Sequence, residues 1–131
     1  MLRSTCVLTP VLALGLLCLA PIAQAETFTC QFTEPFFTLT YATQSERLTR
    51  KSADERPRVT KRVSFSITGP GAFVLKDRKG KELARLELSN KGSDGMGNTV
   101  YPYEIKLPDA GGANNGLGGC SSSLLPKKEG K

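Results

Sequence analysis

The sequence predicts an all-β fold, a small antiparallel barrel or sandwich of about seven short strands with one disulfide. Three observations support this class. Apolar residues alternate with polar ones in several short runs, turn residues separate these runs, and no segment shows a convincing helical period. Short strands joined by turn residues are typical of antiparallel all-β domains.

The alternating runs can be followed along the chain. The first run breaks at Glu34-Pro35, because proline cannot donate a ladder hydrogen bond, and it resumes at once. Residues 42–57 are polar and charged, which predicts a mobile hairpin loop, and residues 69–71 and 77–80 predict turns. The residues expected to point inward are Phe28, Cys30, Phe32, Phe37, Leu39, Tyr41, Val59, Val63, Phe65, Ile67, Ala84, Leu86, Leu88, Tyr101, Tyr103, Ile105 and Leu107.

The N-terminal residues 1–25 predict a cleaved signal peptide. Val11 to Ala20 is apolar throughout, and Ala23-Gln24-Ala25 has the small-x-small form that signal peptidase cuts. The apolar run is too short for a membrane-spanning helix, which needs about 20 apolar residues, so we expect no transmembrane segment. The mature protein would then begin at Glu26 and be periplasmic or secreted, in a bacterium.

Removal of the signal leaves a chain long enough for one modest core. We expect a single β domain over residues 26–120, a flexible basic tail over residues 121–131, and a monomer. Of the four cysteines, only Cys30 and Cys120 remain after cleavage, and in an oxidising compartment they predict one disulfide. Closing a loop of about 90 residues would stabilise the fold by roughly 4–5 kcal/mol in the chain-entropy model.

The charge of the chain is basic. Only Arg3 of the 18 Lys and Arg residues lies in the signal, which leaves 17 basic against 12 acidic residues, a net charge of +5. Nucleic acid is not an expected partner for an exported protein, so one interpretation of the basic segment is attraction to an anionic envelope polymer. The favoured alternative is a solvated loop and strand face, because acidic residues interrupt the segment. Its basic members are Arg47, Arg50, Lys51, Arg56, Arg58, Lys61 and Arg62.

Catalysis is not expected from this composition. The chain has no histidine, which excludes Ser-His and Cys-His nucleophile systems and histidine-based metal sites. Glu34 and Asp94 could in principle act as an acid and base pair, since both lie in constrained turns. Calcium binding by residues 93–99 is disfavoured, because one carboxylate is too few. We therefore expect a non-enzymatic protein without a cofactor or metal.

The glycine-punctuated stretch from Ser93 to Tyr103 is the least explained by core alternation, together with the kink from Glu34 to Phe37. Asp94 is expected to accept backbone N–H bonds within its own loop. Phe36 and Phe37 cannot both point into the core of a strand, so one of them would be exposed or fill a bulge. For Phe36, Phe37 and Met96, core or loop-anchoring roles are favoured over a ligand surface. The candidate binding residues are Glu34, Phe36, Phe37, Ser93, Asp94, Met96, Tyr101 and Tyr103.

Two motifs resemble those of a family of small, uncharacterised bacterial envelope proteins and lipoproteins. Residues 30–37, Cys-Gln-Phe-Thr-Glu-Pro-Phe-Phe, resemble the Cys-x-Gly-Thr-Glu-Pro-Phe-Trp opening of that family. Residues 93–96, Ser-Asp-Gly-Met, followed by Tyr101-Pro102, resemble its Cys-Ser-Asp-Gly-Met-Ser-Asp…Tyr-Pro motif, and Gly119-Cys120 matches a terminal Gly-Cys pair. Gly92 stands where the family has a cysteine. The resemblance implies a small exported β domain and no particular activity.

The sequence therefore predicts an exported, non-enzymatic binding module of the bacterial envelope that acts through the loop from Ser93 to Thr99 and the neighbouring kink. One alternative is an inhibitor of a cell-wall hydrolase such as lysozyme, although basic animal lysozymes would repel a basic partner. Another is a binder of anionic envelope polymers through Arg47 to Arg62. These alternatives stay open on the sequence alone.

Overall fold

A computed structural model describes residues 24–33, 35–109 and 116–130 of the chain. The predicted signal peptide lies outside the described residues except for its last two positions. The described residues form strands and no helix, so this part of the chain contains no helix that could span a membrane. The strands are β1 (Thr27–Phe32), β2 (Phe37–Ala42), β3 (Arg47–Ser52), β4 (Arg58–Thr60), β5 (Ser64–Gly69), β6 (Ala72–Lys76), β7 (Glu82–Gly92), β8 (Thr99–Lys106), β9 (Leu117–Ser122) and β10 (Lys128–Glu129).

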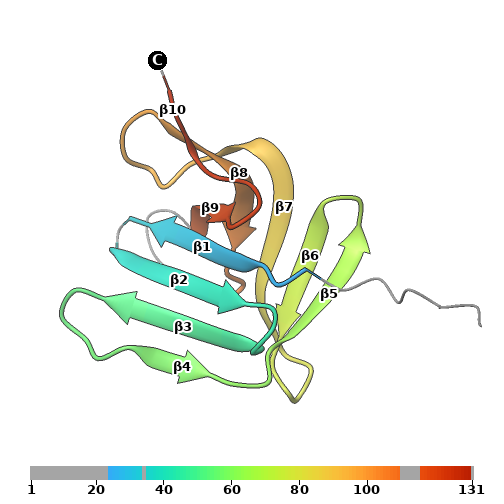
Figure 1. Cartoon of the computed structure of the whole chain (residues 1–131). Helices are drawn as coiled ribbons and strands as arrows, with labels where there is room; N and C mark the ends of the chain where they lie inside the picture. The colour runs from blue at the N-terminus through green and yellow to red at the C-terminus, as the bar shows by residue number, and fades with distance from the viewer. Residues whose placement is uncertain (1–23, 34, 110–115, 131) are drawn as a thin grey trace, which may run out of the picture.

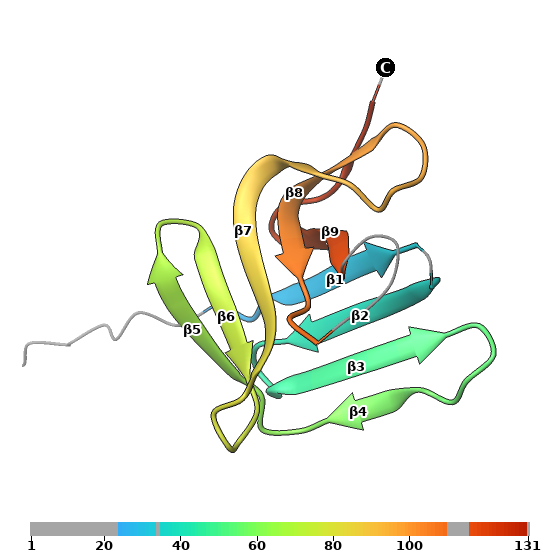
Figure 2. The same cartoon turned by 180° about the vertical axis from the view of Figure 1, so that it is seen from behind.

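The ten strands form one antiparallel sheet in the order β4-β3-β2-β1-β9-β8-β7-β6-β5, and β10 pairs with β8. The chain runs outward from β1 to β4, crosses through residues 61–63 to β5, and returns through β6, β7 and β8 to β9 beside β1. The sheet bends strongly, so that the β1–β4 part faces the β5–β7 part (Figures 1 and 2). A pairing of β4 with β5 would close the sheet, but the described residues of these strands do not pair.

The hydrophobic core lies on the concave face of the bent sheet. Aromatic rings from distant strands meet there: the ring centroid of Phe65 is 5.6 Å from that of Phe28 and 4.7 Å from that of Phe73. The crossing between the two sheet edges is fixed to this core, because Val63 is fully buried and its carbonyl oxygen accepts a 2.8 Å hydrogen bond from the hydroxyl of Tyr41. Aromatic pairs of this kind add to the stabilisation from burial alone.

The Cys30–Cys120 disulfide is confirmed. The two cysteines are direct register partners on β1 and β9, and both are buried. The disulfide therefore joins the two strands where the beginning and the end of the domain meet.

The predicted all-β class with one disulfide is confirmed, but the expectation of seven strands in a barrel or sandwich differs from the ten-stranded open sheet. Strand β3 lies within residues 42–57, where a loop was expected. The stretch from Val59 to Ile67, whose odd-numbered apolar residues were expected to point inward along one strand, is divided into β4 and β5, because Arg62 adopts a positive φ of 60° that a strand cannot continue through. The tail over residues 121–131, which was expected to be flexible, contains the end of β9 and all of β10.

Three residues predicted to point inward are exposed instead. Ile67 is 72% exposed, because it lies on the edge strand β5 next to a register shift. Leu88 precedes a register shift in β7. Val59 alternates with Arg58 and Thr60, which take the concave side of β4, so its side chain faces the other way.

Candidate functional site

The structure brings together the two stretches that the sequence singled out. The Thr33 hydroxyl donates a hydrogen bond to the backbone carbonyl oxygen of Asp94, which joins the end of β1 to the β7–β8 loop. The carboxylate of Asp94 accepts hydrogen bonds from the backbone N–H of Met96 at 2.8 Å and from the hydroxyl of Tyr101 at 2.9 Å. The prediction that Asp94 accepts hydrogen bonds within its own loop is confirmed, and both of its carboxylate oxygens are used in holding that loop.

The surface of this region is formed by fewer residues than the sequence suggested. Tyr101 and Tyr103 are buried, and burial together with the hydrogen bond to Asp94 raises the pKa of Tyr101 to about 12. Phe36 and Met96 are 62% and 54% exposed. Of the other candidates, Ser93 is exposed, Phe37 is buried and stacked on Phe32, and Glu34 lies outside the described residues.

The pairing of β2, β3 and β4 creates a second candidate site, which the sequence did not predict as such. Leu39, Arg50 and Arg58 are direct partners in one cross-strand row, and Tyr41, Leu48 and Thr60 form the next row. Cross-strand partners point to the same face of a sheet, and Leu39 points into the core. The two arginines therefore lie on the concave face.

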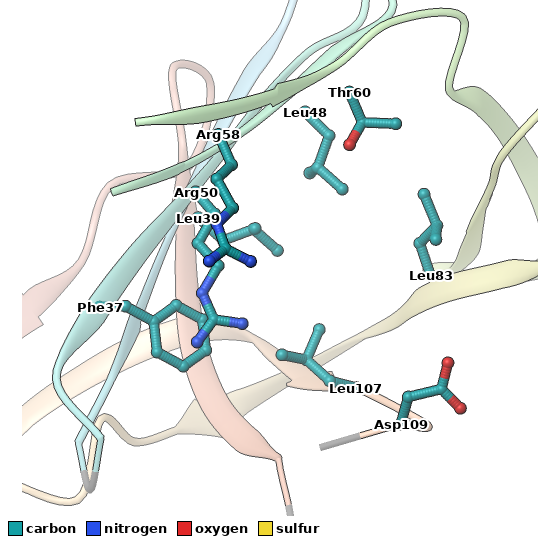
Figure 3. Close-up of a pocket in the computed structure, with 9 residues that line it drawn as sticks. All are labelled: Phe37, Leu39, Leu48, Arg50, Arg58, Thr60, Leu83, Leu107 and Asp109. Carbon is teal, nitrogen blue, oxygen red and sulfur yellow. The ribbon is translucent and has the colours of Figure 1, made fainter. Parts of the chain in front are cut away.

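These rows form one wall of a groove with a volume of about 290 Å³. The opposite wall consists of Leu83 near the start of β7, with Leu107 and Asp109 just after β8. Figure 3 shows both guanidinium groups pointing into the space beside the ring of Phe37. We call this site the arginine groove; its lining residues are Phe37, Leu39, Leu48, Arg50, Arg58, Thr60, Leu83, Leu107 and Asp109.

The charges of the arginine groove are poorly balanced. The guanidinium of Arg50 lies 4.0 Å from the ring centroid of Phe37, and within the described part of the chain it makes no ion pair. Arg58 stands directly opposite it on β4. The Arg58 side chain is 75% exposed, and its ion-pair partner among the described residues, Glu55 at 3.5 Å, is 55% exposed. Like charges placed directly opposite one another on neighbouring strands repel. The groove therefore presents two adjacent positive charges over an apolar floor.

The acid on the opposite wall does not offset these charges. The carboxylate of Asp109 lies 2.6 Å from the ammonium of Lys81, and this exposed ion pair raises the pKa of Lys81 through the hydrogen bond to Asp109. The described residues contain no group of three His, Cys, Asp or Glu side chains that could hold a metal ion. The groove as described offers cationic and apolar contacts.

The predicted basic segment from Arg47 to Arg62 does not form a single surface. Side chains alternate along β3, so Arg47 and Lys51 point away from the face that carries Leu48 and Arg50. The sequence placed Arg50 and Arg58 in a basic cluster but could not show that they share a face. The one signal that could have indicated it was the spacing of Leu48 and Arg50, because residues two positions apart on a strand point to the same face.

Comparison with known proteins finds no match: no protein-family model, no curated protein and no solved structure is similar enough to the chain to assign it. The resemblance to the small envelope-protein family stays a hypothesis, and the function must be argued from the site itself.

Proposed function

We propose that the protein is an exported, non-enzymatic binding protein of the bacterial envelope that holds an anionic ligand in the arginine groove. The observation that carries this proposal is the pair Arg50 and Arg58, which face each other on an apolar concave surface. Among the described residues, the one carboxylate that forms an ion pair with either of them is the solvent-exposed Glu55. An oxyanion between them would relieve their repulsion and form charge-assisted hydrogen bonds, which are about twice as strong as neutral ones. Arginine suits this role because its planar donors match a carboxylate or phosphate.

The disulfide supports the compartment in this proposal. Cys30 and Cys120 are buried and bonded, and such bridges persist in oxidising compartments such as the bacterial periplasm. The envelope is also rich in anionic components that a mature chain with 17 basic and 12 acidic residues, a net charge of +5, would attract.

The test measures retention of anionic envelope components on the immobilised mature protein at low and at high salt. The Arg50→Ala/Arg58→Ala variant should lose this retention. The matched control is Arg47→Ala/Lys51→Ala, which also removes two positive charges, but from the opposite face of β3. Equal losses in both variants would show that net charge, rather than the groove, is responsible, and unchanged retention in the first variant would overturn the proposal.

The second candidate is an interface with a protein, and in particular inhibition of a cell-wall hydrolase. Phe36 and Met96 support it, because both are more than half exposed and they belong to the two stretches joined by the hydrogen bond from Thr33 to Asp94. Exposed apolar side chains that gather on one surface mark protein contacts. A lysis assay with lysozyme tests this candidate: a molar excess of the protein should slow lysis, and Phe36→Ser/Met96→Ser should remove the effect. Full lysis at large excess would exclude inhibition of that enzyme.

A further inference from the structure

We infer that the ligand of the arginine groove is a small amphipathic monoanion, with an oxyanion held by Arg50 and Arg58 and an apolar body of about eight carbon atoms. This inference rests on the proposed function and names the class of ligand. It follows from the apolar lining, the volume of the groove and the distribution of charge between its two walls.

The lining requires an apolar ligand body. Phe37, Leu39 and Leu48 form the floor from β2 and β3, and each is at most 8% exposed. Leu83 and Leu107 cover the opposite side and pack against the core. Leu83 and Leu107, which are only partly buried, therefore supply most of the apolar surface that stays open to a ligand. A fully hydrated ligand, such as a sugar or a free phosphate, would leave this surface without a partner, whereas ligand pockets lined by apolar side chains bind ligands with apolar bodies.

The volume limits the size of that body. The groove encloses about 290 Å³. A water molecule takes up about 30 Å³ of liquid, so the space admits roughly ten non-hydrogen atoms. This corresponds to about the size of octanoate, whose eight carbon atoms include that of the carboxylate group.

The charge distribution favours one anionic group per ligand. Arg50 is held beside the ring of Phe37, which reduces the side-chain freedom that binding would otherwise have to remove. Arg58 is its direct cross-strand partner, so the guanidinium groups of both arginines can reach one oxyanion. At the other wall, a second anionic group would meet leucine side chains or the carboxylate of Asp109, which is already paired with Lys81. A long polyanion would therefore gain little from the groove itself.

Isothermal titration of the oxidised protein with octanoate, octanol and acetate tests this inference. Octanoate should bind with a dissociation constant of roughly 0.1–1 mM, as expected for a ligand of about ten atoms. Octanol, which keeps the chain and lacks the charge, and acetate, which keeps the charge and lacks the chain, should each bind at least tenfold more weakly. Arg50→Ala/Arg58→Ala should lower the affinity for octanoate to that for octanol, while Arg47→Ala/Lys51→Ala should leave it unchanged.

A second pair of variants tests the apolar part of the site. Leu107→Ser should weaken octanoate binding at least threefold, whereas Leu117→Ser, at an exposed position outside the groove, should not. The inference is overturned if octanoate does not bind, or if it binds the Arg50→Ala/Arg58→Ala variant as tightly as the unaltered protein. Retention of anionic envelope polymers that depends on Arg50 and Arg58, measured separately, would then leave the proposed function standing while the small-ligand inference fails. If octanoate does not bind and the retention of envelope polymers does not depend on Arg50 and Arg58, both the small-ligand inference and the proposed function are refuted.

Discussion

Removing the Cys30–Cys120 disulfide is expected to cost most of the stability of this domain. The two residues are 90 positions apart, so the bridge closes almost the whole domain into a ring. In the chain-entropy model, a loop of this length destabilises the unfolded state by about 4–5 kcal/mol. Small domains are typically stable by only about 5–15 kcal/mol. We therefore expect the variant Cys30→Ala/Cys120→Ala to be marginally folded at 37 °C.

Urea unfolding followed by circular dichroism measures this loss. The oxidised protein, the same protein reduced with dithiothreitol, and the double alanine variant should be compared at one pH. The reduced protein keeps both sulfur atoms, so its loss of stability reports the constraint on the chain alone. The further loss in the variant reports the packing of two side chains that are at most 3% exposed. A loss below about 1 kcal/mol on reduction would show that the unfolded chain is already compact, and would refute the entropic argument.

Three further substitutions, and one control substitution at Gly69, test individual contacts. Gly119→Ala should destabilise the protein by about 1–3 kcal/mol in urea unfolding, because its Cβ would lie 2.5 Å from the ring of Tyr101, whereas Gly69→Ala, with its nearest contact at 4.0 Å, should be close to neutral. The stability should fall as the pH rises from 10 towards 12, since the unfolded chain releases the Tyr101 proton near pH 10 and the folded chain keeps it to about 12. Tyr101→Phe should reduce this fall in the free energy of unfolding by about 2–3 kcal/mol. An unchanged pH profile would contradict the assignment of the raised pKa to Tyr101. Tyr41→Phe should cost about 1–2 kcal/mol by thermal unfolding, because the Val63 carbonyl loses its 2.8 Å hydrogen bond; an unchanged midpoint would mean that water replaces the hydroxyl.

The sequence predicted the parts of the fold that depend on local chemistry. Alternation identified β1 and β2, the count of cysteines gave the disulfide, and the role of Asp94 followed from the turn preferences of its own loop. Strand β3 was missed because Leu48 is its one large apolar residue, so its six residues look like a loop until they are paired with β2. Pairing with the neighbouring strands β2 and β4, which stabilises β3, leaves no signal within the segment itself.

The arginine groove could not be predicted for a related reason. Arg50 and Arg58 are separated by a turn whose length fixes which residues pair, and a shift of one position would place the two arginines on opposite faces. Gly92 shows the same dependence on neighbouring strands. A Cβ at this position would overlap the carbonyl oxygen of Tyr103, so the structure requires a glycine here. That constraint exists only after β7 pairs with β8.

The strand order also determines what a single backbone cut would do. The segment from Cys30 to Cys120 contains every strand from β2 to β8. Residues 61–63 connect the two edge strands of the sheet, β4 and β5. A protease that cleaves after Lys61 or Arg62 would thus yield two fragments of unequal size. The Cys30–Cys120 disulfide would keep these fragments covalently attached. On a denaturing gel the nicked chain would migrate as one species without reductant and as two species with it. The protein could be cleaved at this crossing and still remain one covalent molecule.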